Sequence, residues 1–103
     1  MRCIVKMNIP VEAGNETIRS GKLQKTIESV VKEFKPEAAY FFADRGQRTG
    51  FFVFNLKDPS EIPMVAEPFF LAFNAAVEIS PAMNLEDLMK AGPHIQAAIK
   101  KHA

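Results

Sequence analysis

Residues 2–9 alternate between two kinds of side chain. Every second position from Cys3 onward is apolar, and a period of two indicates a β-strand that buries one face. The buried side of this strand would consist of Cys3, Val5, Met7 and Ile9. Pro10 ends the strand, because proline has no backbone amide to donate to a sheet.

A helical period follows. After a loop at Gly14, Asn15 is a candidate N-cap for a short first turn. Five apolar residues then recur at the spacing of one helix face: Leu23, Ile27, Val30, Val31 and Phe34. At about 100° per residue, Ile18 falls nearly opposite this stripe. We therefore expect a break near Gly21 and the main helix over residues 22–34.

The middle of the chain predicts a β-hairpin. Two runs rich in aromatic and β-branched residues cover Ala38 to Ala43 and Thr49 to Leu56. The sequence Asp44-Arg45-Gly46-Gln47 between them is typical of a tight turn.

A second helix and a fourth strand come next. Ser60 is a candidate N-cap for an apolar stripe at helical spacing that consists of Ile62, Val65, Ala66, Phe69 and Phe70. Pro68 lacks an amide and crowds the carbonyl of Met64, so we expect a kink or restart around Glu67. Residues 75–80 alternate again, as a strand requires.

The last twenty residues predict two short helical pieces. Asn84 and Asp87 resemble a capping box, with Asp in place of the preferred Glu or Gln. Gly92-Pro93 would separate the first piece from the second.

The order strand, helix, strand, strand, helix, strand predicts an α+β domain of the ferredoxin-like type. Right-handed crossovers place both helices on one face of an antiparallel sheet, and the C-terminal helical segment is an addition to this plan. A chain of 103 residues is long enough for one core and too short for two, so we expect a single domain over residues 1–103.

Strand parity divides the sheet residues between two faces. The helix side receives Cys3, Val5, Met7, Phe41, Phe52, Phe54, Val77 and Ile79. The other face receives Ile4, Lys6, Asn8, Tyr40, Phe42, Phe51, Val53, Asn55, Ala76, Glu78 and Ser80. Burying apolar surface contributes about 25 cal/mol per Å², so a face this apolar favours a second copy as its cover. Two such faces related by a twofold axis would close into a dimeric α/β barrel.

Polar groups on the same face indicate a ligand site. The candidate ligand-binding residues are Lys6, Asn8, Tyr40, Phe51, Asn55 and Glu78. The first and fourth strands should be neighbours, so Lys6 and Glu78 could pair, and one of them could act as an acid or base on a carbonyl or phenolic ligand. The simpler interpretation is an ion pair that fixes the register of the dimer. No catalytic residue can be assigned.

Charge and composition argue against nucleic acid and membranes as partners of this protein. Thirteen basic and twelve acidic residues give a formal charge of +1, so nucleic acid and an anionic membrane surface are poor partners. No apolar run approaches the roughly 18 to 20 residues of a membrane span. The single cysteine, Cys3, and the absence of an apolar leader at the start favour the cytoplasm.

Metal and cofactor sites are not predicted. His94 and His102 are the only histidines and stand eight positions apart without an acidic neighbour, whereas metal centres gather three or four ligands. Cys3 has the pattern of a core residue. Arg45 and Arg48 flank the turn glycine, where an anion could bind, but such arginines are mostly solvated. We expect no metal and no cofactor.

Three segments carry a resemblance to a known family. They are Pro36-Glu37-Ala38-Ala39-Tyr40-Phe41, Gly46-Gln47-Arg48-Thr49-Gly50-Phe51 and Ile62-Pro63-Met64-Val65-Ala66-Glu67-Pro68-Phe69-Phe70. With the element order, they resemble an uncharacterised bacterial family in the dimeric α/β-barrel superfamily, over almost the whole chain. The resemblance implies a homodimer whose cavity between the sheets, where functional, holds a small molecule. Relatives in the superfamily include isomerases and oxygenases, so the resemblance assigns no reaction.

The leading hypothesis is a small homodimeric protein that binds an aromatic or carbonyl-containing molecule between its sheets. Two alternatives stay open. One is a cofactor-independent isomerase or monooxygenase, which would need a cavity large enough for its substrate. The other is a structural or regulatory dimerisation module with a filled barrel and no ligand.

Overall fold

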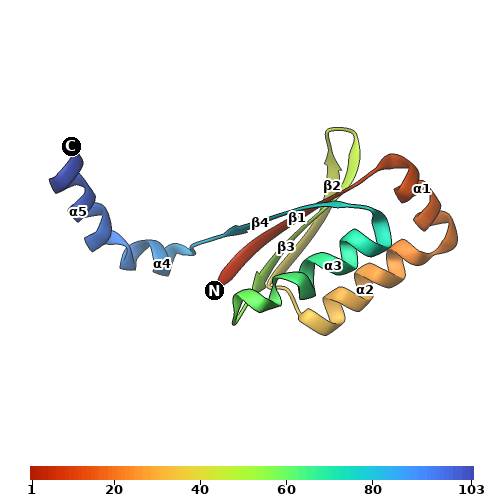
Figure 1. Ribbon diagram of the computed structural model, residues 1–103, viewed down its shortest axis with the longest axis horizontal. Coiled ribbons are helices and arrows are strands. Elements are labelled where there is room, and N and C mark those ends of the chain that lie inside the picture. The colour runs from red at the N-terminus through yellow and green to blue at the C-terminus, as the bar shows by residue number, and fades with distance from the viewer.

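The computed structural model describes residues 1–103 and has an α+β architecture (Figure 1). Its elements in chain order are β1 (Arg2–Ile9), α1 (Val11–Ser20), α2 (Lys22–Phe34), β2 (Ala38–Asp44), β3 (Gln47–Asn55), the 3₁₀ turn η1 (Pro59–Glu61), α3 (Ile62–Phe73), β4 (Ala76–Pro81), α4 (Leu85–Lys90) and α5 (Gly92–His102). The predicted fold class is confirmed at this level, and the arrangement is compatible with a ferredoxin-like fold.

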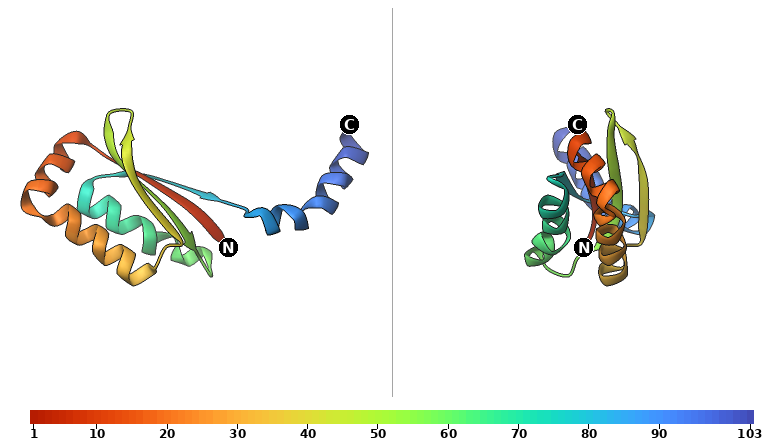
Figure 2. Two further views of the ribbon diagram at one scale, coloured as in Figure 1. Left: turned by 180° about the vertical axis from the view of Figure 1, so that it is seen from behind. Right: turned by 90° about the vertical axis from the view of Figure 1, so that its right-hand side faces the viewer.

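The four strands form one antiparallel sheet in the order β2-β3-β1-β4. The helices α1, α2 and α3 lie on one side of this sheet, as the end-on view in Figure 2 shows. The other side carries no helix, and we call it the open face. The sheet therefore has one covered and one uncovered surface, and β2 and β4 are its edges.

The core fills the space between the sheet and the helices. The four β1 residues of the predicted buried side are each no more than 2% exposed, which confirms the alternation in this strand. Phe52 of β3 stacks on Phe69 of α3 with ring centroids 5.1 Å apart. The remaining buried members of this core are Val30, Phe54, Leu56, Val65, Phe73 and Ala75.

The start of the first helix differs from the prediction. The helix α1 begins directly after Pro10, so Asn15 is not an N-cap and no loop exists at Gly14. Gly14 is instead buried inside the helix, where an added Cβ would lie 2.6 Å from the guanidinium of Arg48. The break at Gly21 is confirmed, with a φ of 81° that suits glycine, and α2 has the expected bounds.

The second helical region also differs in its details. Asp58, and not Ser60, caps the turn η1, where its side chain accepts a hydrogen bond from the Ser60 amide and forms a capping box with Glu61. The helix α3 then continues through Pro68 without a restart. A proline removes a single hydrogen bond, and the helix is held by its buried side chains, which include Val65 and Phe69.

The hairpin turn is tighter than the sequence suggested. Asp44 pairs directly with Gln47, so only Arg45 and Gly46 stand between the strands. Their φ angles are 53° and 75°, which is the geometry of a two-residue type I′ turn. The strands therefore extend farther toward the turn than the predicted limits of Ala43 and Thr49.

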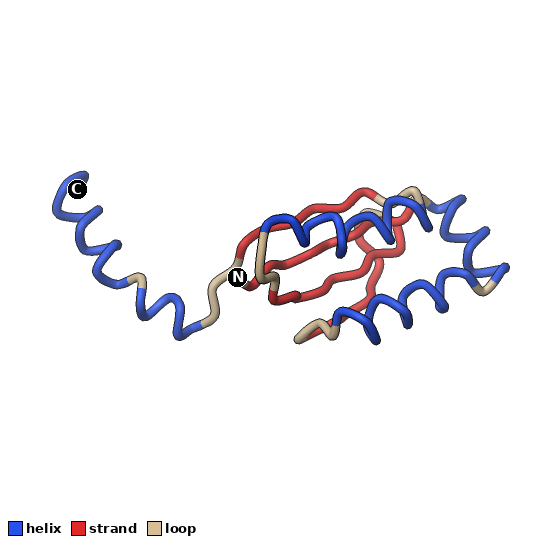
Figure 3. Tube along the Cα trace, turned by 60° about the horizontal axis from the view of Figure 1, so that its bottom comes forward, coloured by secondary structure: helices blue, strands red, loops and turns tan.

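The two C-terminal helices form an arm that projects from the end of β4 (Figure 3). We call residues 82–103 the C-terminal arm. The predicted capping box is confirmed, with the Asn84 side chain accepting from the Asp87 amide, and α5 begins at Gly92. The arm makes the molecule 57 Å long, with a radius of gyration of 16.9 Å against about 13 Å for a compact chain of this length.

None of the helices has the length and apolar character needed to cross a membrane.

Candidate functional site on the open face

One cross-strand row on the open face contains four of the six predicted site residues. Tyr40 of β2 pairs with Phe51 of β3, Phe51 pairs with Lys6 of β1, and Lys6 pairs with Glu78 of β4. Directly paired residues in an antiparallel sheet point to the same side. The row thus places a phenol, a phenyl ring, an ammonium group and a carboxylate side by side across the whole width of the sheet.

The two ends of this row have no polar partner. Tyr40 is 65% exposed, and neither its hydroxyl nor the Glu78 carboxylate takes part in any side-chain hydrogen bond or ion pair. With strands about 4.8 Å apart, these end residues are separated by about 14 Å within one chain. A small ligand can therefore contact one end of the row or its middle, but not both ends.

Lys6 has a different partner from the one expected. Its ammonium group lies 2.7 Å from Oδ2 of Asp44, at the end of the hairpin strand β2. No ion pair joins Lys6 to Glu78, although the two residues are direct cross-strand neighbours. The hydrogen bond from Lys6 lowers the pKa of the Asp44 carboxyl below its ordinary value, and the charge of Lys6 acts in the same direction. The Glu78 carboxylate consequently stays available.

Asn8 completes this polar group. Its amide nitrogen donates to Oγ1 of Thr49 at 2.8 Å and more weakly to Oδ2 of Asp44 at 3.5 Å. Thr49 is buried and donates in turn to the carbonyl of Gln47. These contacts fix the side of the site nearest the hairpin.

A polar pocket of about 270 Å³ lies over these groups. It is lined by Lys6, Asn8, Asp44, Arg45, Gln47, Ala76 and Glu78. Three predicted site residues thus share one pocket, and sequence reasoning missed Asp44 and Gln47, which belong to the turn. Their polarity is explained by turn formation alone, so no signal in the sequence distinguished them as ligand contacts.

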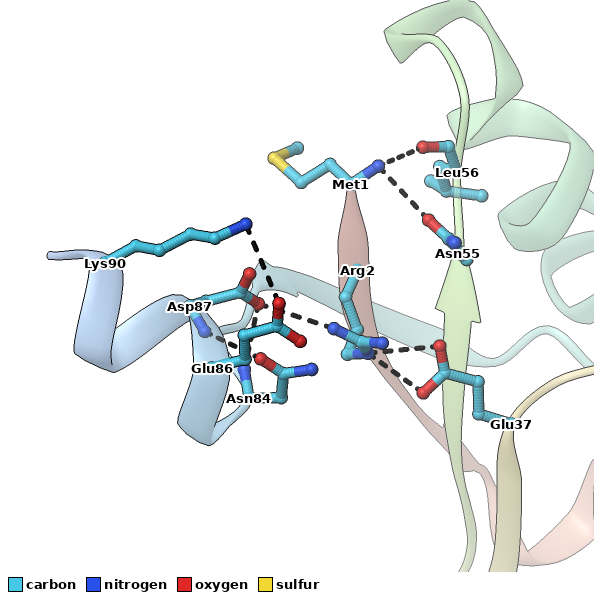
Figure 4. Close-up of polar contacts among 9 residues, drawn as sticks. All are labelled: Met1, Arg2, Glu37, Asn55, Leu56, Asn84, Glu86, Asp87 and Lys90. Carbon is cyan, nitrogen blue, oxygen red and sulfur yellow. Dashed lines mark hydrogen bonds and ion pairs between the residues drawn. The ribbon is translucent and has the colours of Figure 1, made fainter.

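Asn55 lies apart from the other predicted site residues. It pairs with Arg2 at the opposite end of the sheet, and its side-chain oxygen accepts a hydrogen bond from the amino group of Met1 at 3.2 Å (Figure 4). The expectation that one pocket unites Asn55 with Lys6 and Glu78 is therefore not met within one chain. Tyr40 and Phe51 share the row with Lys6 but do not line the polar pocket.

A larger apolar groove lies on the helix side, between α2 and the hairpin. Its volume is about 550 Å³, and its apolar lining consists of Met7, Ile9, Leu23, Ile27, Phe41 and Phe42. Arg48 also lines the groove. We expected its guanidinium to be solvated, but it donates to the side chain of Asn15 at 3.0 Å. The polar lining residues of the groove are Gln24, Glu28, Arg48 and Thr49. Each of them already has a hydrogen-bond partner within the chain, so the groove offers a ligand volume but no free polar group to orient it. We therefore place the candidate site on the open face.

No three His, Cys, Asp or Glu side chains come together in a way that could hold a metal ion. His94 and His102 both lie on α5 in the arm and are exposed. Cys3 is buried in the core, as expected.

Comparison with models of known protein families and with curated proteins gives no match for this chain.

Proposed function

We propose that two copies of this chain pair through their open faces and bind a small aromatic or carbonyl-containing molecule between the two sheets. The observation that carries this proposal is the row Tyr40, Phe51, Lys6 and Glu78. It joins aromatic surface to a free carboxylate on a face without helices. The resemblance to the dimeric α/β-barrel superfamily supports the same arrangement, and the buried Cys3 suits the cytoplasm as the location.

The physical case for a second copy rests on exposed apolar side chains. On β2, Tyr40 is 65% exposed, and Ile4, Phe51 and Val53 are half-buried. Water covers such a surface at a cost of about 25 cal/mol per Å². A twofold partner removes this cost for both copies at once, because the same patch meets its own image.

The polar groups would orient the ligand. Lys6 and Asp44 satisfy each other's charge, so the ligand meets them as a neutral pair, while Glu78 accepts a hydrogen bond from a phenolic hydroxyl or similar donor. The aromatic face of Phe51, which lies between the two ends of the row, would contact the flat part of the molecule. A second subunit seated on the open face would enclose this pocket further.

Ligand screening by NMR tests this proposal. Amide chemical shifts of the labelled protein are recorded with small phenols, benzaldehydes and benzoquinones as probes. We expect shifts at the open-face row, with binding lost in Glu78→Ala and weakened in Lys6→Ala. The matched controls are Glu67→Ala and Lys57→Ala, which remove exposed charges of the same sign elsewhere. The proposal would be contradicted if no probe binds, or if a probe binds with the same affinity to all four variants as to the native protein.

An isomerase is the second candidate function, and the unpaired Glu78 is the observation that favours it. A carboxylate of this kind could take a proton from the carbon next to a carbonyl group and return it to another carbon, without an oxidant or cofactor. Turnover of an enolisable ketone that disappears in Glu78→Gln would establish it. If neither binding nor turnover is found in a stable dimer, the structural dimerisation module is the correct description.

A further inference from the structure

The C-terminal arm has an apolar surface that its own chain does not cover. The exposed fraction is 74% for Leu85, 72% for Met89, 47% for Ile95 and 51% for Ile99. Ile95 and Ile99 are four residues apart in α5 and therefore lie on the same side of the helix. Exposed apolar groups repeated along both helices indicate a contact surface.

The helices of the arm are too short to be stable by themselves. The helix α4 has 6 residues and α5 has 11, whereas isolated helices below about 12 to 15 residues are marginal in water. Local contacts help α4, through its capping box and an ion pair of 3.8 Å between Lys90 and Glu86. Packing against another surface would supply the remaining stability.

One residue of the sheet holds the base of the arm. The Arg2 guanidinium donates to the Glu37 carboxylate at 2.9 Å and to Oδ2 of Asp87 in α4 at 3.4 Å (Figure 4). Arg2 lies on β1 with the parity of the open face, two positions before Ile4. The arm is thus joined to the rim of the open face, and its helices continue away from the sheet (Figure 1).

The arm would enlarge an interface that a second copy forms with the open face. The four strands have 8, 7, 9 and 6 residues and span roughly 480 Å² of flat sheet. A stable interface buries about 800 Å² of accessible surface on each partner. The two helices of the arm add a rod about 25 Å long. A second copy that contacts both the open face and the arm therefore buries more surface than one that contacts the open face alone.

We infer that the apolar side of the arm packs on a second copy of this chain, so that each subunit of the dimer holds the other with its arm. This inference rests on the proposed pairing through the open faces and adds a second contact to it. The exchange is reciprocal, because a twofold axis gives each subunit one arm to donate and one surface to receive.

The experiment compares two arm variants with one open-face variant by sedimentation equilibrium. Ile95→Glu with Ile99→Glu should raise the dimer dissociation constant about tenfold or more. Ala97→Glu with Lys101→Gln changes the net charge by the same two units on the opposite side of α5 and should leave the constant within about twofold. Val53→Glu tests the open face separately.

A second measurement needs no variant. Chains with ¹³C-labelled isoleucine methyl groups are mixed with unlabelled chains, and isotope-filtered NOEs are recorded between subunits. We expect NOEs from the Ile95 and Ile99 methyl groups to the unlabelled copy. The arm inference alone is overturned if Val53→Glu weakens the dimer, the isoleucine variant does not, and NOEs from the arm arise only within one chain. A monomer whose arm folds over its own open face overturns both proposals.

Discussion

Lys6 forms its ion pair with Asp44 on the far side of β3, although Glu78 is its direct neighbour on β4. The long lysine stem makes this diagonal contact possible. As a result, one acid of the open face is neutralised and the other is free. This division separates a structural role for Asp44 from a ligand-binding role for Glu78.

The pKa of Asp44 should report this pairing directly. Lys6→Met removes the hydrogen bond and the positive charge that lower it, so the pKa should rise toward the ordinary value of about 3.9. Glu78→Gln, the matched control, should leave the Asp44 titration unchanged. The measurement is a ¹³C NMR titration of the carboxyl group. A pKa that responds to Glu78→Gln and not to Lys6→Met would show that the ion pair is wrongly assigned.

Stability should fall in acid partly because of the same carboxyl. A pKa that is lower in the folded than in the unfolded protein gives stability above the unfolded value of about 3.9, and this stability is lost as the pH falls through the folded pKa. Urea unfolding between pH 5 and pH 2 should therefore show a shallower decline for Asp44→Asn than for the native protein. Part of the decline should persist, because the Ser60 amide also lowers the pKa of Asp58. Equal slopes for the two proteins would refute the linkage.

Gly50 should be intolerant of a side chain. An added Cβ would lie 2.8 Å from Cε of Met7 and 2.9 Å from the ring of Phe52. Overpacking of this kind costs about 1 to 3 kcal/mol of unfolding free energy, so Gly50→Ala should lower stability by that amount. Gly92→Ala is the control, because no atom lies within 4 Å of its added Cβ. Chemical denaturation of both variants checks the prediction, and equal stabilities would argue against this packing.

Phe52 should be the most costly aromatic residue to remove. It is fully buried and contacts the rings of Phe41, Phe54 and Phe69 at centroid distances of 5.1 to 5.7 Å. Phe52→Ala should cost about 3 to 5 kcal/mol. Phe70→Ala makes the same change at a residue that is 41% exposed and should cost clearly less. Thermal and denaturant unfolding measure the free energy of unfolding that each variant loses. Equal losses for the two variants would contradict the central place of Phe52 in the core.

The sequence predicted the elements that depend on local periodicity. The alternation in β1, the break at Gly21 and the capping box at Asn84 were all correct, because each follows from backbone geometry and nearest neighbours. The start of α1 was wrong, since the glycine and asparagine in its middle favour loops. Tertiary burial of Gly14 beneath Arg48 overrides that preference.

The sequence predicted which face of the sheet the site residues occupy, because side chains alternate between the two faces along a strand. It did not predict which of these residues lie close together. Parity places Tyr40, Phe51, Lys6 and Glu78 on one face, and the register joins them in one row. Asn55 shares their parity but lies at the other end of the sheet, and parity carries no information about distance along a strand. The Lys6–Asp44 contact depends on the tight turn of the hairpin, which sequence patterns describe only approximately.

The mass of the protein in solution tests the central claim most directly. If a second copy covers the open face, sedimentation equilibrium at micromolar concentration should give about 23 kDa, twice the 11.5 kDa of one chain. A mass of 11.5 kDa under these conditions would contradict the claim, and the proposed site between two sheets would be lost with it.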